Sequence, residues 1–358
     1  MKTNLTTLGL IAALAAGFAA QAQTVEPPAF GYLNSDITVP SNTDVIASLP
    51  FSGAPATSGI VSAGTANSLT ITDAAFTTDQ YRDRYYVRIR SGVDNGLWTT
   101  IVSNTATTLF TADDVTTVVA GDAIEIVNHQ TLDSVFPAAL ANILFVPSTA
   151  TSVAGRKTTI HLIGPPPTIG ISRAPGSGGT FFYYSGKWRS TTATSVDAGT
   201  TILIPQQYYI IRNGGGASQT LQVLTAGAVN PSTIATYTER GGSAQGQNDN
   251  PLATGRPMDL SLNDLGLGGS SAFVDSLSTS LLDRRDTVWL FDNTRTGINR
   301  SPGSGGIYFR YAGTWRRTTA PGVDVSTNLI LQAGAGFVVR KSTNSVQQTE
   351  VWAETITP

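Results

Sequence analysis

The sequence predicts an all-β protein with two homologous antiparallel β-domains, sandwich-like or meander-like, the first of which carries an inserted small β-barrel-like module. Three observations support this fold class. Short β-branched and aromatic segments alternate with clusters of Gly, Pro, Asn and Ser about every 10 residues, which is typical of all-β chains. A long segment recurs later in the chain. Only 13% of the residues are charged and 41% are hydrophobic, so the composition indicates packed cores and not disorder.

The N-terminus has the three parts of a secretory signal peptide. Lys2 supplies a positive charge, an uncharged apolar run extends from Leu8 to Ala20, and Ala20-Gln21-Ala22 is a small-x-small cleavage site. The run is shorter than the roughly 20 residues that a membrane-spanning helix needs. We therefore expect cleavage after Ala22 and export to the periplasm, the cell surface or the medium. No later segment is apolar enough to cross a membrane, so no integral membrane segment is expected after cleavage.

An internal repeat organises the rest of the chain. Residues 170–199 are identical to residues 297–326 at 18 of 30 positions. A weaker likeness upstream places Ile46 opposite Leu252, and between these ends the first copy is longer by about 80 residues. One domain type used twice, with a module inserted at a surface turn of the first copy, is the simplest explanation. The expected boundaries are 1–22 for the signal peptide, 23–52 and 131–225 for the first β-repeat domain, 53–130 for the inserted small β-module, 226–250 for a linker and 251–358 for the second β-repeat domain.

The inserted module has its own strand pattern. Ser68–Ile71 and Tyr85–Arg90 alternate apolar with polar residues, as half-buried strands do. Three similar short segments follow within residues 97–127. Five or six short strands in this length predict a small, strongly curved antiparallel barrel or meander.

The segment between the two copies is rich in Gly and Gln, and we interpret residues 226–250 as a linker. Within it, Asn248-Asp249-Asn250 offers oxygen ligands that suit calcium, although a linker turn is the preferred interpretation. Residues 260–282 have no clear period and leave room for one or two short helices.

Charge and cysteine content exclude several classes of function. The chain has 22 basic and 24 acidic residues, so it has no basic field that would bind a nucleic acid backbone. It has no cysteine, which excludes disulfides, thiolate nucleophiles and cysteine-ligated metals.

No catalytic constellation stands out. His161 lies in an expected strand where the other copy has Trp289, which favours a packing role, and we expect a structural role for His129 as well. A Ser–His–Asp site needs a histidine held by a carboxylate, and no serine lies in a G-x-S-x-G elbow. Ser177 and Ser304 lie in glycine-rich turns.

Two pairs of carboxylates are candidates for the acid and the nucleophile of a glycosidase: Asp113 with Asp114, and Asp283 with Asp286. Solvated or salt-bridged surface acids are the preferred interpretation. We accordingly predict no catalytic, cofactor-binding or metal-binding residues.

The repeated aromatic strands are the strongest candidates for ligand binding. In each copy a Phe and a Tyr that are identical between the copies share one strand face, and we place this face in the core. The variable face, with Phe181 and Tyr183 in the first copy, is expected to meet solvent. Core packing is also the preferred role of Trp188 and Trp315. If these two indoles lie on an exposed edge, they form a platform for sugar rings. The candidate ligand-binding residues are Tyr183, Trp188, Arg189, Tyr308, Arg310, Trp315 and Arg316.

Several motifs occur together in both copies: an Asn/Ser-x-Ser/Ala-Pro-Gly-Ser turn, an aromatic strand before Gly-x-Trp-Arg, and the closing segment Gly336–Lys341. Together with Gly96-Leu97-Trp98 of the insert, they resemble an uncharacterised family of secreted, β-rich, paralogous bacterial proteins with duplicated "GxNxSPGS…YFYxxGxWR…GFxIRK" type repeats. The likeness covers nearly the whole mature chain. It implies secretion and a duplicated β-fold, and because the family has no assigned activity it carries no catalytic residues over to this chain.

These observations favour an exported, non-enzymatic structural or surface-associated protein of a bacterial envelope or extracellular matrix. One alternative is a carbohydrate-binding protein that uses the aromatic strands of the two repeats, and a second is a glycoside hydrolase. The expected partners are polysaccharides or other envelope or matrix components, with no nucleic acid and no cofactor. Self-association stays open at this point.

Overall fold

The computed structural model describes residues 30–138, 145–164, 170–215, 219–230 and 233–354, so the expected signal peptide lies outside the described residues. Nearly all regular elements are strands, and the all-β prediction with a barrel-like module is confirmed. The helical elements among these residues are the single-turn helix α1 (Leu132–Val135) and two 3-10 turns, at Val153–Gly155 and Leu281–Asp283. Within the described ranges no helix has the length and apolar character needed to cross a membrane.

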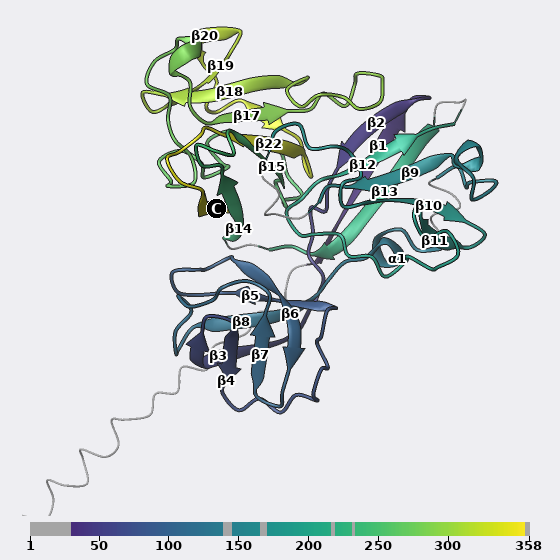
Figure 1. Cartoon of the computed structure of the whole chain (residues 1–358), viewed down its shortest axis with the longest axis vertical. Coiled ribbons are helices and arrows are strands. Elements are labelled where there is room, and N and C mark those ends of the chain that lie inside the picture. The colour runs from purple at the N-terminus through teal and green to yellow at the C-terminus, as the bar shows by residue number, and fades with distance from the viewer. Residues whose placement is uncertain (1–29, 139–144, 165–169, 216–218, 231–232, 355–358) are drawn as a thin grey trace, which may run out of the picture.

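The first repeat is a five-stranded antiparallel sheet with a two-stranded ribbon (Figure 1). The sheet has the order β11-β10-β9-β12-β2, and the ribbon pairs β1 with β13. Its strands are β1 (Phe30–Val39), β2 (Thr43–Ala47), β9 (Thr158–Leu162), β10 (Gly179–Tyr184), β11 (Lys187–Ser190), β12 (Tyr209–Asn213) and β13 (Gln219–Ala228).

The second repeat has the same plan, with the sheet order β15-β22-β17-β18-β19-β20 and the ribbon β14-β23. A short pair, β16 with β21, completes it. Its strands are β14 (Ile234–Arg240), β15 (Asn248–Ala253), β16 (Leu260–Ser261), β17 (Thr287–Leu290), β18 (Gly306–Tyr311), β19 (Thr314–Arg317), β20 (Ala320–Asp324), β21 (Leu329–Leu331), β22 (Gly336–Lys341) and β23 (Gln348–Glu354).

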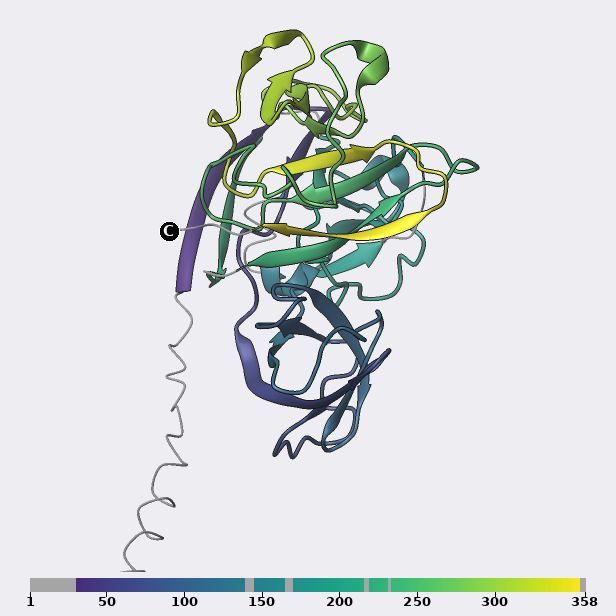
Figure 2. The ribbon, with the colours of Figure 1, turned by 90° about the vertical axis from the view of Figure 1, so that its left-hand side faces the viewer.

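The third part is a closed six-stranded barrel with the order β3-β4-β7-β6-β5-β8, which lies below the two repeats in Figures 1 and 2. It lies within the stretch expected for the insert. Residues at alternate strand positions, such as Leu69, Ile101 and Ile126, fill its interior, as the alternating pattern predicts. The barrel strands are β3 (Pro55–Thr65), β4 (Ser68–Ile71), β5 (Tyr85–Ile89), β6 (Trp98–Asn104), β7 (Thr108–Thr111) and β8 (Ala123–Asn128).

The prediction of a linker at residues 226–250 is wrong. Residues 226–250 hold all of β14 and the first residues of β15, and Asn248-Asp249-Asn250 is strand, not a turn. These residues form strands because each pairs with a partner distant in sequence: β14 with β23 and β15 with β22. The Gly- and Gln-rich composition reflects the short connection between those two strands.

The upstream alignment of the copies is shifted by one residue. Ala47 pairs with Tyr209, and Leu252 pairs with Phe337, so Ala47 and not Ile46 is the counterpart of Leu252. A shift of one residue reverses which side chains face the core.

The face assignment of the aromatic strands is wrong for the variable face, whereas Phe182 and Phe309 of the identical face are buried, as predicted. Phe181 and Tyr183, placed in solvent above, lie in the core of the first repeat. Phe182 lies on the opposite face under the guanidinium of Arg156, 4.9 Å from the ring centroid, and Arg284 lies 4.7 Å from the Phe309 centroid in the second repeat. The identical residues therefore maintain a shared stacking with arginine.

The matched tryptophans have the same place in both cores but different polar contacts. Trp188 is 1% exposed and donates from Nε1 to the backbone oxygen of Phe136 at 3.1 Å. Trp315 is fully buried, and its Nε1 has no acceptor among the described residues. Each indole fills its core, but only one completes a hydrogen bond there.

We predict that Trp188→Phe destabilises the protein more than Trp315→Phe does. Both changes remove similar volume, but the first also leaves the buried oxygen of Phe136 unpaired, which costs about 1–3 kcal/mol, whereas the second removes an unpaired donor. Denaturant unfolding of the two variants measures the difference. Equal losses would contradict the hydrogen-bond assignment.

Candidate functional site

The two repeats pack through the outer faces of their sheets. Ile46, Tyr208 and Ile210 of the first repeat form a buried cluster with Val338 of the second, and Phe291 packs against it. The rings of Tyr208 and Phe291 meet edge to face, with centroids 5.3 Å apart. This contact fixes how the surfaces of the two repeats lie relative to each other.

At the rim of this contact, the second repeat covers the edge strand β2 of the first. The side chain of Asn293 accepts from the N–H of Ile46 at 3.0 Å and donates to the oxygen of Ile46 at 2.9 Å. The N–H of Asp44 donates to the backbone oxygen of Gly297 at 3.0 Å. The edge strand thus has its outward backbone groups satisfied by a loop of the other repeat.

Asp44 is the centre of this contact. It is 1% exposed and accepts from Arg212 at 2.6 and 2.8 Å, a bidentate pair, and from the backbone N–H of Asn299 at 2.7 Å. One carboxylate therefore joins a strand of its own repeat to a turn of the other.

The equivalent contact of the second repeat is centred on Asp249. This residue is 2% exposed and accepts from Arg340 at 2.7 and 2.9 Å and from the N–H of Ser172 at 2.6 Å. Its own N–H donates to Gly170, the residue equivalent to Gly297. The repeats are therefore locked reciprocally, each turn binding the edge strand of the other.

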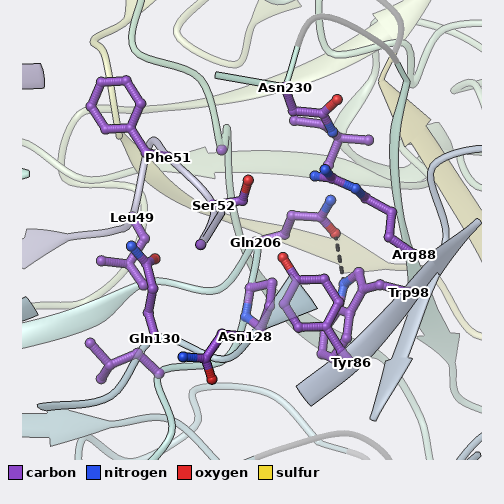
Figure 3. Close-up of a pocket in the computed structure, with 15 residues that line it drawn as sticks. Leu49, Phe51, Ser52, Tyr86, Arg88, Trp98, Asn128, Gln130, Gln206 and Asn230 are labelled. Carbon is purple, nitrogen blue, oxygen red and sulfur yellow. Dashed lines mark hydrogen bonds between the residues drawn. The ribbon is translucent and has the colours of Figure 1, made fainter. Parts of the chain in front are cut away.

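The barrel is attached where all three parts meet, at the pocket shown in Figure 3. Trp98 of β6 donates from Nε1 to Oε1 of Gln206 in the first repeat at 3.1 Å. The N–H of Ala235 in β14 donates to Gly96 of the barrel at 3.0 Å. This pocket has a volume of about 50 Å³, far below the roughly 300–1,000 Å³ of ordinary ligand sites. We interpret it as a structural junction.

A much larger cleft lies between β2 and the second repeat, and we call it the inter-repeat groove. Its volume is about 470 Å³, which lies within the range of ligand sites. Its polar walls include Ser48, Asp292, Arg317 and Gln332, and Phe291 adds an aromatic surface. Donors, acceptors and an aromatic ring in one cleft of this size suit a polar organic ligand.

The groove is open in only one of the two repeats for a local reason. In the first repeat the equivalent recess measures about 90 Å³ and is lined by Gln207 and Tyr208. The second repeat has Ala335 and Gly336 at the aligned positions. Gly336 is required because an added Cβ would lie 2.5 Å from Cβ of Tyr208 across the interface. The close packing of Tyr208 therefore requires a residue without a side chain at position 336, and this leaves the groove open.

The aromatic platform is not available to a ligand. Tyr183, Trp188, Tyr308 and Trp315 are 2%, 1%, 5% and 0% exposed, so none presents a face to sugar. The strands carry these residues inward because alternation directs them at the hydrophobic cores. The hypothesis that the aromatic strands themselves bind carbohydrate is therefore corrected.

The arginines among the candidates have structural contacts. Arg189 and Arg316 stack over Tyr184 and Tyr311 and donate to backbone oxygens, and Arg310 forms an ion pair with Asp275 at 2.6 Å. The structure does not bring the seven candidate residues together, because they belong to two separate repeats.

Both histidines are buried. His161 contacts the hydroxyls of Thr159 and Thr180 at 2.8 and 3.2 Å, and His129 contacts Thr100 at 3.2 Å. Burial lowers the pKa of each histidine to about 4, and the Arg212 charge contributes at His161. Hydroxyls surround His161 where a catalytic histidine would need a carboxylate.

The proposed carboxylate pairs have separate roles. Asp286 forms a salt bridge with Arg240 at 2.5 Å, as the preferred interpretation allowed, but it is buried and not at the surface. Asp283 accepts from Ser278, and Asp113 accepts from Thr99. Within the described ranges, no group of three or more His, Asp and Glu side chains is placed to hold a metal ion.

No family model, no curated protein and no solved structure matches the chain. The groove was missed in the sequence because segments far apart in the chain line it, including those with Ser48, Arg317 and Gln332. One signal was present: the aligned segments Pro205–Tyr208 and Ala333–Gly336 differ sharply in side-chain volume.

We predict that neither histidine titrates between pH 5 and 8. Because the folded pKa of about 4 lies below the unfolded value of about 6.5, the unfolded chain takes up protons first as the pH falls. The free energy of unfolding should therefore decrease between pH 6.5 and 4, by roughly 3 kcal/mol per histidine at most. Proton NMR of the two imidazoles checks this, and a midpoint near 6.5 in the folded protein would contradict it.

Proposed function

We propose that this chain is an exported, non-enzymatic structural or surface-associated protein of a bacterial envelope or extracellular matrix. The observation that supports this proposal is the reciprocal lock between the repeats at Asp44 and Asp249. With the barrel hydrogen-bonded to both repeats, each of the three β-modules contacts the other two. Direct contacts of this kind, with the edge strands β2 and β15 each covered by the other repeat, suit a scaffold that presents its surfaces without changing shape.

One experiment tests both the contacts at Asp44 and Asp249 and the export of the protein. The full chain is expressed in a secreting bacterium, and immunoblots follow it in cytoplasm, periplasm, envelope and medium. We expect the parent protein in the exported fractions. The double variant Asp44→Asn/Asp249→Asn should appear in the same fractions as proteolytic fragments. Each change removes a charged acceptor and should lower the free energy of unfolding by about 2 kcal/mol, which raises the population open to proteases.

The matched control is Asp79→Asn, because among the described residues the side chain of Asp79 contacts only Arg82, in an exposed ion pair. This control should be exported intact. Recovery of the parent protein in the cytoplasm would contradict the proposal. Enzymatic turnover of a substrate that is lost on a single-residue replacement would also contradict the proposal.

The inter-repeat groove supports a second candidate function, carbohydrate binding. In this version the sugar binds in the groove and not on the aromatic strands. Asp292 and Gln332 offer acceptors, Arg317 offers donors, and Phe291 offers an aromatic surface. Sugars are recognised by such combinations because their hydroxyls both donate and accept.

Narrowing the groove should abolish such binding. Ala335→Gln introduces the residue that occupies the equivalent recess of the first repeat, and we expect at least a tenfold loss of glycan binding on an array. Thr319→Gln, at an exposed position outside the groove, should bind like the parent. Unchanged binding by Ala335→Gln would exclude the groove as the site.

A further inference from the structure

The second repeat buries a lysine. Lys341, the last residue of β22, is 0% exposed, although lysine is among the residue types that are almost never fully buried. Its Nζ donates to Oε2 of Glu350 in β23 and to Oγ1 of Thr238 in β14, the latter at 3.2 Å. The ammonium group therefore connects the six-stranded sheet to the ribbon β14-β23. Asn213 occupies the equivalent position of the first repeat, so this feature belongs to the second copy alone.

The charges around Lys341 balance as two neighbouring pairs. Arg240 of β14 is 2% exposed, and both of its terminal nitrogens donate to the carboxylate of Asp286, at 2.7 and 2.5 Å. The same arginine lies 3.5 Å from Oε2 of Glu350. Because Asp286 neutralises Arg240, the carboxylate of Glu350 is the direct counter-ion of Lys341.

This environment favours the neutral forms of Lys341 and Glu350. Taking two charges out of water is costly even when they are paired. Burial lowers the pKa of Lys341, although the contact with Glu350 opposes that shift. A proton that moves from Nζ to the carboxylate leaves a neutral amine, which is the form of lysine that attacks a carbonyl carbon. The guanidinium of Arg240 lies beside the oxygen that gains negative charge during such an attack.

We propose that Lys341 and Glu350 condense in the folded chain to an amide, an isopeptide bond that joins β22 to β23. Nζ forms a bond to Cδ of Glu350, and the bond from Cδ to one carboxylate oxygen breaks. That oxygen leaves as water with two of the three protons of the ammonium group, and the amide keeps the third. The reaction is a loss of water without oxidation or reduction, so it needs no co-reactant.

The fold meets the requirements of this reaction. It holds the amine against the carboxylate, which replaces a bimolecular encounter by a reaction within one site. The product is a neutral amide, so the cost of keeping the Lys341–Glu350 charges away from water is removed, and the balanced pair of Arg240 and Asp286 remains. The side chain of Glu350 is 15% exposed, which gives the released water a path to solvent. The proposal does not depend on the proposed function.

Tryptic digestion of the purified full chain, denatured before digestion and followed by mass spectrometry, tests the bond. Trypsin cleaves after lysine and arginine, and neither residue occurs after Lys341 in the chain. The unlinked chain should yield a peptide that begins at Ser342. The linked chain should resist cleavage after Lys341 and yield the peptide 341–358, lighter than its sequence mass by one water. Fragment ions should locate that loss between Lys341 and Glu350.

The chain offers an internal control. Lys187 and Asp197 form an exposed ion pair at 3.5 Å, and trypsin should cleave after Lys187 because solvated charges have no comparable tendency to condense. Glu350→Ala should restore cleavage after Lys341 and the full peptide mass, and Asp197→Asn should retain the linked peptide. The parent protein decides the test even if Glu350→Ala fails to fold. A Ser342 peptide as the main product of the parent would overturn the proposal, and so would a loss of water that persists in Glu350→Ala.

Discussion

The structure depends on one constraint: the outward N–H and C=O groups of an edge strand must find partners or be left open to other chains. In this protein each repeat meets that need for the other. Asp44 and Asp249 are buried acids at equivalent positions, and each is neutralised by an arginine of the adjacent strand. The equivalent of Ile46 is Pro251, which has no N–H to satisfy, so the two edges need different numbers of bonds.

Duplication supplied a symmetric frame, and the distinctive features arise where the copies differ. The second repeat buries Arg240 with Asp286 and Lys341 with Glu350, whereas the first has Thr158 and Asn213 at the positions of Asp286 and Lys341. Buried ion pairs of this kind are sensitive to loss of either partner. The open groove and the inserted barrel are also features of one copy only.

The sequence predicts the fold class, the barrel-like module and the repeat well, because strand periodicity and local identity are carried by neighbouring residues. It fails where the outcome depends on distant contacts. Phe182 and Phe309 are buried, as their identity suggested, but each packs under an arginine that precedes a neighbouring strand, on the face opposite Phe181 and Tyr183. Asn248 to Asn250 looked like a turn because their pairing partner, β22, lies about 90 residues away. The groove depends on the approach of Tyr208 to Gly336, which the sequence indicates only when the two aligned copies are compared.

The barrel starts and ends at the same point: Pro55 at the start of β3 pairs with Val127 near the end of β8. All of its pairings therefore lie within residues 55–128, whereas β1 and β2 pair with β13 and β12, which follow the barrel and strands β9, β10 and β11 in the sequence. During synthesis, which proceeds from the N-terminus, the barrel is the first unit whose partners are all present. The insertion thus sets the order of folding. The barrel forms early, whereas β1 and β2 can pair only after β12 and β13 have been synthesised.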